Sequence, residues 1–420
     1  MSPVTRNPSP DPAAPLRILT FSTLYPNAAQ PSHGVFVENR IRHLAASGAA
    51  KIEVVAPVPV FPVVRHFMPA YAEAEKAPLQ EVRHGLTVRH PRYLLMPKIS
   101  MLAAPLSLYC SARPVVAQLK RDGFDFDLID AHYFYPDGIA AVMLGRHFRR
   151  PVTITARGTD INLIPEHYWP GRMIQWAARE SAGMITVCAA LKDGLTALGA
   201  DAAKIRVLRN GVDLQVFRPV DRNAARQRLG LTAPTLLSVG HLIPRKAHDL
   251  VIRAVAQLPG YHLLIAGLGP EEQRLRALAR TSGVEDRVRF LGRVAHDQLR
   301  EVYGAADLLV LASSREGWAN VLLESMACGT RVAASDVWGT PEVVAAPEAG
   351  ALFKERTPDA IAATVRKVMA QPEDRAATRR YAEGFSWDDT TRGQLELFRA
   401  IVAAERSSPS NALAAAGTSL

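Results

Sequence analysis

The chain alternates short apolar runs with segments whose apolar residues recur at helical spacing. Near the start, Val37, Ile41, Leu44 and Ala45 follow that spacing, and Gly48 closes the segment. In the first half, apolar runs predict buried strands at residues 16–21, 52–56, 128–131, 151–155 and 184–187. A strand, a loop and a helix therefore open the chain, an order that is typical of the α/β class.

The second half repeats this pattern around residues 307–334. A strand at 307–312 precedes a turn, a helix at 319–328 that Gly329 stops, and a second strand at 331–334. Further strands are predicted at 235–239, 261–266 and 287–291, and helices at 248–258, 358–369 and from 387 toward 405. In units of this kind, ligands bind at the carboxyl ends of the strands.

Two carboxylates lie in that central unit, Glu316 in the turn and Glu324 inside the helix. On one continuous helix they would sit roughly 80° apart. If the helix begins near Trp318, Glu316 lies above its amino end and Glu324 points outward from its second turn. A carboxylate accepts hydrogen bonds from the paired hydroxyls of a ribose or a sugar. Spacing alone favours two ordinary solvated residues, but the residues around them favour a binding role.

A basic pair, Arg245 and Lys246, lies between the strand at 235–239 and the helix that starts near residue 248. Such a pair on a loop is usually surface charge. At this position, next to the amino end of a helix, two cations would neutralise a diphosphate. The position favours an anion site.

The string Glu316, Gly317, Trp318, Ala319, Asn320, then Glu324 to Gly329, then Gly339 to Glu342, closely resembles the family 4 retaining glycosyltransferases. The resemblance implies an α/β fold of two Rossmann-like domains that face each other across a cleft, called GT-B. It also implies that Glu316 holds the donor sugar and that Glu324 accepts hydrogen bonds from the nucleotide ribose. Residues 317–320 would belong to the same donor site.

The resemblance assigns the phosphates to a lysine, here Lys246, and to an arginine just after the glycine of this loop, Gly240. His241 stands in the place of that arginine, so we expect Arg245 to supply the missing charge, with His241 as the alternative. The backbone around Val294 would meet the base.

Four residues of the first half are candidates for the acceptor or the cleft. Gly34 lies in a loop that resembles the family's entry loop, and it either approaches a ligand or only makes a turn. His132 ends a predicted strand and either faces the cleft or is a hydrogen-bonded structural residue. Arg157, followed by Asp160, stands where many family members carry a histidine that touches the donor sugar.

The motif Asp125-Phe126-Asp127 has the form that binds a divalent metal in a different class of glycosyltransferases, but it precedes its strand, at the wrong end for a site. We expect solvated residues there. No metal and no cofactor are expected. The three cysteines, Cys110, Cys188 and Cys328, are far apart and indicate neither a disulfide framework nor a zinc site, which fits a reduced cytoplasm.

The formal net charge of +10 favours anionic partners, whether nucleoside diphosphates, lipid head groups or nucleic acid. Clustered aromatic residues do not accompany the basic ones, which argues against single-strand binding. The apolar stretch at 96–110 is too short to span a membrane. With the basic residues near 65–68 and Arg113, it either lies on a membrane surface or forms a helix packed on the sheet.

The 420 residues are long enough for two domains. We predict a flexible leader at 1–15, an acceptor domain at 16–205, a nucleotide-sugar domain at 206–385, a helix at 386–406 that crosses back to the first domain, and a disordered tail at 407–420. The predicted function is a cytoplasmic, metal-independent retaining hexosyltransferase. It would move a sugar from a nucleotide diphosphate sugar to a glycan or lipid-linked acceptor in polysaccharide biosynthesis, with peripheral contact at the inner face of the membrane left open. Alternatives are a sugar-nucleotide epimerase or hydrolase of the same fold, or a non-catalytic sugar or nucleic-acid binding protein.

Overall fold

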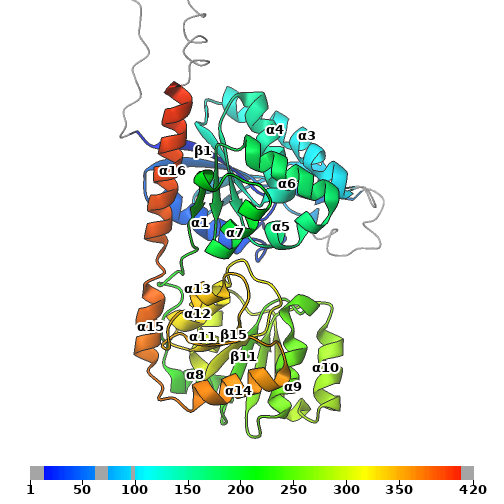
Figure 1. Ribbon diagram of the computed structural model, residues 1–420, viewed down its shortest axis with the longest axis vertical. Coiled ribbons are helices and arrows are strands. Elements are labelled where there is room, and N and C mark those ends of the chain that lie inside the picture. Colours follow the sequence, from blue (N-terminus) through cyan, green and yellow to red (C-terminus); the bar gives the residue numbers. More distant parts are fainter. Residues whose placement is uncertain (1–13, 62–73, 96–99, 408–420) are drawn as a thin grey trace, which may run out of the picture. The chain divides into compact units, whose positions relative to one another are not determined.

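The computed structural model describes residues 14–61, 74–95 and 100–407, drawn in colour in Figure 1. The predictions for most of the leader, for the tail from residue 408, for the basic residues at 65–68 and for residues 96–99 lie outside this part. The chain forms two compact units. The first comprises Met1–Thr155, Pro165–Ile185 and Thr391–Leu420, and the second comprises Ala156–Ile164 and Thr186–Thr390. The domain boundaries drawn from the sequence differ from these units and stay a prediction.

The first unit is built on a mainly parallel sheet. Its strands follow the order β9-β8-β7-β1-β2-β5-β4, with β1 paired in parallel between β2 and β7 and with β4 antiparallel to β5. The strands are β1 Leu16–Phe21, β2 Ala50–Val55, β4 Gln80–Arg83, β5 Leu86–Arg89, β7 Leu128–His132, β8 Val152–Ala156 and β9 Gly183–Thr186, with β3 Val58–Val60 and β6 Arg92–Leu94 as a separate pair. The helices are α1 Val35–Ala46, α3 Ser100–Arg121, α4 Ile139–Phe148 and α6 Tyr168–Glu180. A π-helical turn at Phe134–Gly138 leads into α4.

The apolar stretch near residue 100 lies largely in helix α3, which packs on the folded unit with one side. Its buried side chains recur at helical spacing at Leu108, Ala112, Val116 and Leu119. It packs beside α4 and α6 (Figure 1). The described residues of the stretch therefore form a helix of the folded unit, although its first turns leave apolar side chains exposed.

The last helix, α16 (Trp387–Ser407), is held to the first unit by a buried polar chain. Gln394 accepts a hydrogen bond from Arg40 Nε at 3.1 Å and donates one to Asp130 Oδ2 at 3.0 Å. All three side chains are buried. Burial lowers the pKa of Arg40 to about 10, against the opposing charge of Asp130, so the guanidinium is charged at neutral pH.

The second unit is a doubly wound parallel sheet. Its strands follow the order β13-β12-β11-β14-β15-β16, so the chain first moves outward from β11 and then returns to its other side. The strands of this sheet are β11 Thr235–Val239, β12 His262–Ala266, β13 Val288–Gly292, β14 Leu308–Leu311, β15 Val332–Ser335 and β16 Gly350–Phe353, whereas the short strand β10 Ile205–Val207 is not part of it. The helices are α5 Thr159–Asn162, α7 Ala189–Ala197, α8 Arg222–Arg228, α9 His248–Ala256, α10 Glu272–Thr281, α11 Leu299–Ala305, α12 Asn320–Ala327, α13 Thr340–Val343, α14 Pro358–Met369 and α15 Arg375–Glu383. Short 3-10 turns lie at Ala202–Lys204, Pro244–Lys246 and Glu285–Arg287, and another, Ile164–Glu166, lies where the two units meet in the sequence.

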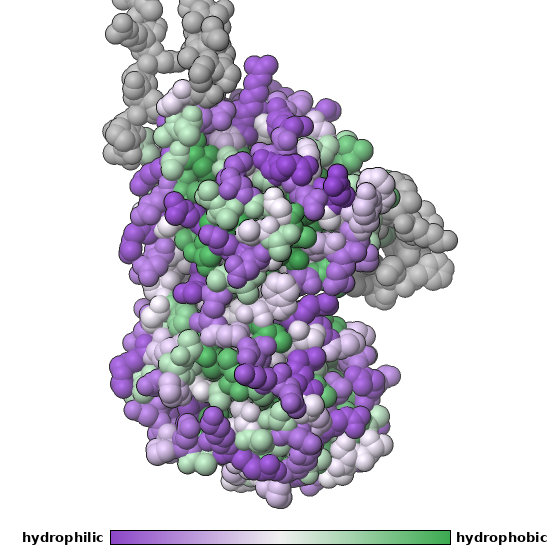
Figure 2. Space-filling view, viewed as in Figure 1, coloured by the Kyte–Doolittle hydropathy of each residue, from purple (hydrophilic) through white to green (hydrophobic). Residues whose placement is uncertain are grey.

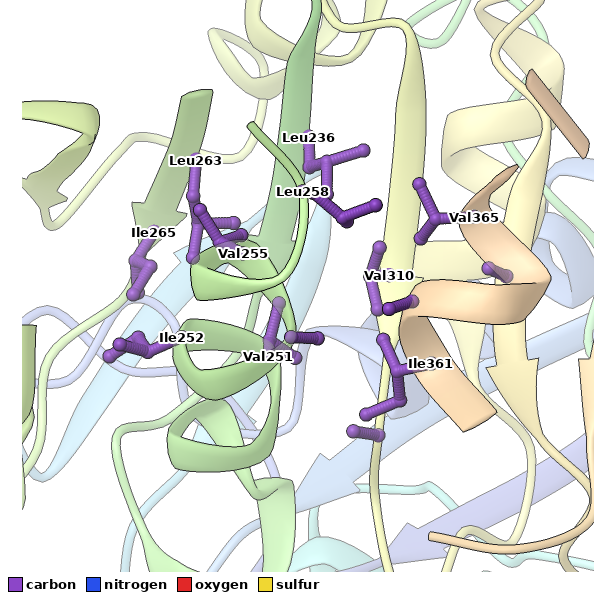
Figure 3. Packing of buried hydrophobic residues seen from close by; sticks show 14 of the residues in the cluster. Leu236, Val251, Ile252, Val255, Leu258, Leu263, Ile265, Val310, Ile361 and Val365 are labelled. Carbon is purple, nitrogen blue, oxygen red and sulfur yellow. The ribbon is translucent and has the colours of Figure 1, made fainter. Parts of the chain in front are cut away.

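Helices α9, α10 and α14 cover one face of this sheet. Figure 3 shows side chains of α9 and α14 pointing onto strands β11, β12 and β14. The labelled residues are Val251, Ile252, Val255 and Leu258, Ile361 and Val365, and, on the strands, Leu236, Leu263, Ile265 and Val310. The central strands β11, β12, β14 and β15 are buried almost throughout, as expected for a parallel sheet covered by helices on each side.

The predicted strands at 16–21 and 235–239 are confirmed to the residue, and most other predicted elements differ only at their ends. On the face shown in Figure 2, hydrophilic and hydrophobic residues are interspersed. Within the described ranges, no helix is both long and apolar enough to cross a membrane.

Candidate functional site

The carboxyl ends of β11 and β14 lie side by side because these two strands pair in the sheet. The strand order reverses at this pair, which is the position where open α/β sheets bind ligands. The loop after β11 carries Gly240 to Lys246, and the loop after β14 carries Ser313 to Gly317. The basic loop and the turn that carries Glu316, both candidates from the sequence, therefore lie together at the carboxyl edge of the sheet.

Glycines let the loops at this edge approach each other closely. A Cβ atom added to Gly267, whose φ is +151°, would lie 1.9 Å from the carbonyl oxygen of Gly240. The amide of Gly240 donates to the carbonyl of Ala266 at 3.0 Å, and Gly240 itself has a φ of +149°. A side chain at Gly267 would force these two loops apart.

Glu316 is paired with both cations of the basic loop. Its Oε1 lies 2.6 Å from Lys246 Nζ, and its Oε2 lies 3.6 Å from Arg245 Nη1. Arg245 Nη1 also donates to the carbonyl oxygen of Arg315 at 2.8 Å. The Glu316 side chain is only 9% exposed, so it is not the solvated residue that spacing alone favours.

The pKa of Glu316 reflects this environment. Burial raises it, but the charges of Lys246 and Arg245 outweigh burial and leave the pKa below its ordinary value. His248, at the start of α9, contributes no charge at neutral pH, because burial and the nearby Lys246 lower its pKa to about 4. The site therefore combines one carboxylate with two cations, an arrangement that can hold sugar hydroxyls beside an anion.

Glu324 lies on α12 with both oxygens engaged. Its Oε2 accepts a hydrogen bond from the Tyr303 hydroxyl at 2.8 Å, and its Oε1 lies 3.1 Å from His296 Nε2. The residue is 8% exposed, so the expected outward orientation is wrong. The reason is that α11 and the loop before it cover this side of α12.

The loop at 156–164 lies against Gly317. A Cβ atom added to Gly317 would come 2.0 Å from the carbonyl oxygen of Arg157. Arg157 Nη1 donates to Asn210 Oδ1 at 3.1 Å, and Asn210 Nδ2 donates to Asn320 Oδ1 at 3.3 Å. The Asp160 carboxylate holds the turn by accepting from the amides of Arg157 and Gly158, at 3.0 and 2.8 Å. Arg157 and Asp160 therefore lie near the Glu316 loop.

The other candidates of the second unit vary in exposure. Trp318 and Ala319 are buried beside the start of α12, whereas Val294 is half-buried in the loop after β13. His241 is exposed. Its side chain can meet a ligand, but Arg245 is the residue that contacts Glu316.

Gly34 and His132 belong to the first unit. A Cβ atom on Gly34 would lie 2.3 Å from the carbonyl oxygen of Leu24, and its φ of +73° begins α1, so the turn requires glycine. His132 is fully buried, with Nε2 3.1 Å from Asp130 Oδ2. Of the two alternatives for His132, this geometry supports the hydrogen-bonded structural residue. Asp125, in the acidic motif, is paired with Lys120 and Arg150 near the surface.

Sequence reasoning missed three residues of the site, namely Tyr303, His296 and Asn210. Tyr303 and His296 contact Glu324 from positions 21 and 28 residues earlier. Asn210 precedes Gly211, and an Asn-Gly pair by itself indicates only a turn. A glutamate inside a helix gives no local signal of such distant partners.

Comparison with protein families covers most of the chain in two matches. Residues 34–216 match the model of Glycosyltransferase Family 4, and residues 221–385 match that of Glycosyl transferases group 1. Among curated proteins, D-inositol 3-phosphate glycosyltransferases of Mycobacterium tuberculosis and Mycobacterium bovis are 39% identical over 219 residues. That match spans 49% of this chain and 45% of each relative, so it covers about half the length of the relatives.

Solved structures similar to this chain share its fold. Sucrose-phosphate synthase from Thermosynechococcus elongatus has a TM-score of 0.76 and 21% identity, over 93% of this chain and 100% of that one. Anabaena Alr3699/HepE in complex with UDP has a TM-score of 0.67 and 20% identity, over 91% and 99%. The catalytic domain of starch synthase IV from Arabidopsis thaliana, bound to ADP and acarbose, has a TM-score of 0.71 and 15% identity, over 93% and 100%. These likenesses confirm the predicted α/β class and GT-B fold.

Proposed function

We propose that this chain, which belongs to the family 4 glycosyltransferases of GT-B fold, transfers a sugar from a nucleoside diphosphate sugar to an acceptor hydroxyl. The observation that carries the proposal is the buried contact of Glu316 with Lys246 and Arg245 at the carboxyl ends of β14 and β11. The contact brings together a carboxylate, which can accept hydrogen bonds from sugar hydroxyls, and two cations, which can bind a diphosphate, and this supports the proposal.

Each charged group has a part in donor binding. Lys246 and Arg245 bind the diphosphate, Glu316 accepts hydrogen bonds from the sugar hydroxyls, and Glu324 accepts them from the ribose. Residues 317–320, which lie between Glu316 and Glu324 in the chain, belong to the same donor site. The backbone at Val294 contacts the base. The solved Anabaena structures hold UDP or UDP-glucose, which makes uridine nucleotides the first donors to try.

The proposed reaction retains the anomeric configuration. The acceptor oxygen attacks the anomeric carbon from the side of the leaving group, and the bond from that carbon to the β-phosphate oxygen breaks. The departing phosphate oxygen takes the proton of the acceptor hydroxyl. Lys246 and Arg245 stabilise the negative charge that grows on the diphosphate, and this electrostatic effect is the main contribution of the protein. The acceptor is a glycan or a lipid-linked sugar, as in polysaccharide assembly in the cytoplasm.

A surface of the first unit supports peripheral contact with an anionic membrane. Apolar and aromatic side chains are exposed on the adjacent helices α3 and α6, namely Met101, Leu102, Leu106, Tyr168 and Trp169. The exposed side of α3 also carries Arg113. Exposed apolar residues beside cations are typical of helices that lie in a membrane interface.

Co-sedimentation with vesicles tests this contact. We expect binding to vesicles with anionic lipid that falls as salt rises, and weaker binding after Leu102→Asp with Leu106→Asp. Leu79→Asp, at a residue 70% exposed outside these two helices, is the matched control. Equal binding to neutral and anionic vesicles, or binding to neither, would exclude the electrostatic contact.

A thermal-shift screen of nucleotide sugars tests the donor. A ligand at a hundred times its dissociation constant adds about 2.7 kcal/mol to the free energy of unfolding. Product analysis with the stabilising donor then separates the activities. A transferase gives nucleoside diphosphate only when an acceptor is present, whereas a hydrolase or an epimerase consumes the donor alone.

A further inference from the structure

Glu324 already has two partners without any ligand, and the two differ in how freely they can leave. Tyr303 is fully buried in α11, and its carbonyl oxygen accepts a 2.7 Å hydrogen bond from Thr330 Oγ1. The His296 side chain is 38% exposed and lies in the loop between β13 and α11. Tyr303 is therefore a fixed partner of the carboxylate, and His296 is the one that can move.

We propose that His296 occupies Oε1 of Glu324 in the nucleotide-free protein and must leave it when a ribose binds. The inference rests on the proposed function, because Glu324 is the ribose acceptor there. His296 is then an internal competitor of the nucleotide. Tyr303 keeps Oε2 in place throughout, so the carboxylate is already oriented when the histidine departs.

The position of His296 suits this exchange. Its ring packs edge-on against Phe217, with 4.9 Å between the ring centroids, so Phe217 supports one side of the imidazole. Its neighbours in the loop, Ala295 and Asp297, are exposed, and Val294, assigned to the base, lies two residues before it. A nucleotide that contacts Val294 would thus act on the same loop that carries the competitor.

Protonation of His296 should strengthen its contact with Glu324 and therefore its competition with the ribose. The charged groups that act on His296 are Glu324 from α12, Asp213 from the stretch before α8, and Asp297 from its own loop. Tyr303 from α11 contacts the same carboxylate and the same Phe217 ring. Burial lowers the pKa of His296, but the hydrogen bond and charge of Glu324, followed by Asp213 and Asp297, raise it above the ordinary value overall. A ribose that displaces His296 removes its strongest partner, so binding favours the unprotonated ring. Nucleotide affinity is then expected to rise with pH through the titration of His296.

Calorimetric titration of the full chain with UDP and with ADP tests the proposal. His296→Phe keeps a ring against Phe217 but has no donor for Glu324, so we expect about two- to tenfold tighter binding at pH 6 and no remaining pH dependence from this group. His296→Gln keeps a donor but cannot be protonated, so it should also lose the part of the pH dependence that comes from this position, while the part that comes from the terminal phosphate of the nucleotide stays. The gain in His296→Phe should vanish with the 2′,3′-dideoxy nucleotides, which lack the competing hydroxyls.

The matched control is His262→Phe, because His262 begins β12 at the opposite end of the strand from the site. It should bind as the wild type does at every pH. If no nucleoside diphosphate, whatever its base, binds the wild type, the proposed function fails as well. If the wild type binds and His296→Phe binds equally or more weakly, His296 is a ligand or a support of Glu324, and this inference alone is overturned.

Discussion

Lys246 Nζ lies 2.6 Å from Glu316 Oε1, although 70 residues separate the two in the chain. The contact joins the loop after β11 to the loop after β14 and keeps a cation and a carboxylate at one edge of the sheet. Because Arg245 contacts the other oxygen of Glu316, the site carries a net positive charge before any ligand binds. A diphosphate can then share the two cations with Glu316.

Removing Lys246 should lower turnover more than it lowers stability. We expect Lys246→Ala to lose a few kcal/mol of transition-state stabilisation, at about 1.36 kcal/mol per tenfold in rate. Arg245→Ala should cost a similar amount, since it supplies the second charge. Turnover with the best donor of the thermal-shift screen measures both.

His241→Gln tests the alternative source of that second charge. Because the His241 side chain is exposed, its contribution to transition-state stabilisation should be below the roughly 1.4 kcal/mol that corresponds to a tenfold change in rate. We therefore expect turnover of His241→Gln to stay within about threefold of the wild type. A harmless Arg245→Ala together with an inactive His241→Gln would move the phosphate contact to His241.

The lowered pKa of Glu316 predicts a pH-dependent contribution to stability. The contribution is fully present above pH 4.5, the ordinary value, and is lost as the pH falls through the lower pKa of the folded state. Glu316→Gln should therefore be less stable than the wild type at pH 7, by about 1–3 kcal/mol, and the difference should shrink below pH 4.5. Urea unfolding at several pH values measures it.

Glu383→Gln is the control for this experiment, because Glu383 forms an exposed 2.8 Å ion pair with Arg379 on one helix. Its loss should cost less than about 1 kcal/mol. A Glu316→Gln difference that stays constant from pH 7 to pH 3.5 would show that the charge of Glu316 does not contribute.

The close approach of the loops predicts that Gly267 cannot be replaced. Gly267→Ala places Cβ 1.9 Å from the Gly240 oxygen and should destabilise the fold by more than the roughly 1–3 kcal/mol of backbone strain alone. Gly260→Ala is matched, since Gly260 also has a positive φ, of +80°, but open space around it. Gly260→Ala should lose only the unfolding free energy that corresponds to backbone strain. Equal losses of unfolding free energy in the two variants would mean that the approach at Gly240 is not needed.

The pattern of apolar residues predicts the helices and strands well, because a helix or a strand depends largely on residues that are neighbours in the chain. The strands at 16–21 and 235–239 are bounded by residues that break apolar runs, and the buried positions of α3 follow helical spacing. The motif around Glu316 and the basic loop at Lys246 also stand out in the sequence, so the sequence alone predicts both halves of the candidate site.

The contacts between these halves could not be predicted from spacing. Which strand lies beside β11 depends on the order of the whole sheet, and only that order brings Lys246 to Glu316. Helix spacing alone likewise predicts that Glu324 faces outward, whereas α11 covers this residue and supplies its partner Tyr303. Non-local packing decides both the burial and the partners of these carboxylates.

A comparison of nucleotide affinity in variants of Glu324 and Glu316 tests the central claim most directly. Calorimetry with the bare nucleoside diphosphate should show that Glu324→Ala weakens binding by about tenfold or more, since a charge-assisted hydrogen bond contributes about 1.5–3 kcal/mol. Glu316→Ala should bind the same nucleotide within about threefold of the wild type and yet lose turnover, because its hydroxyl partners belong to the sugar. Equal losses of nucleotide affinity in the two variants, or no loss in Glu324→Ala, would contradict the assignment of the ribose to Glu324 and of the sugar to Glu316.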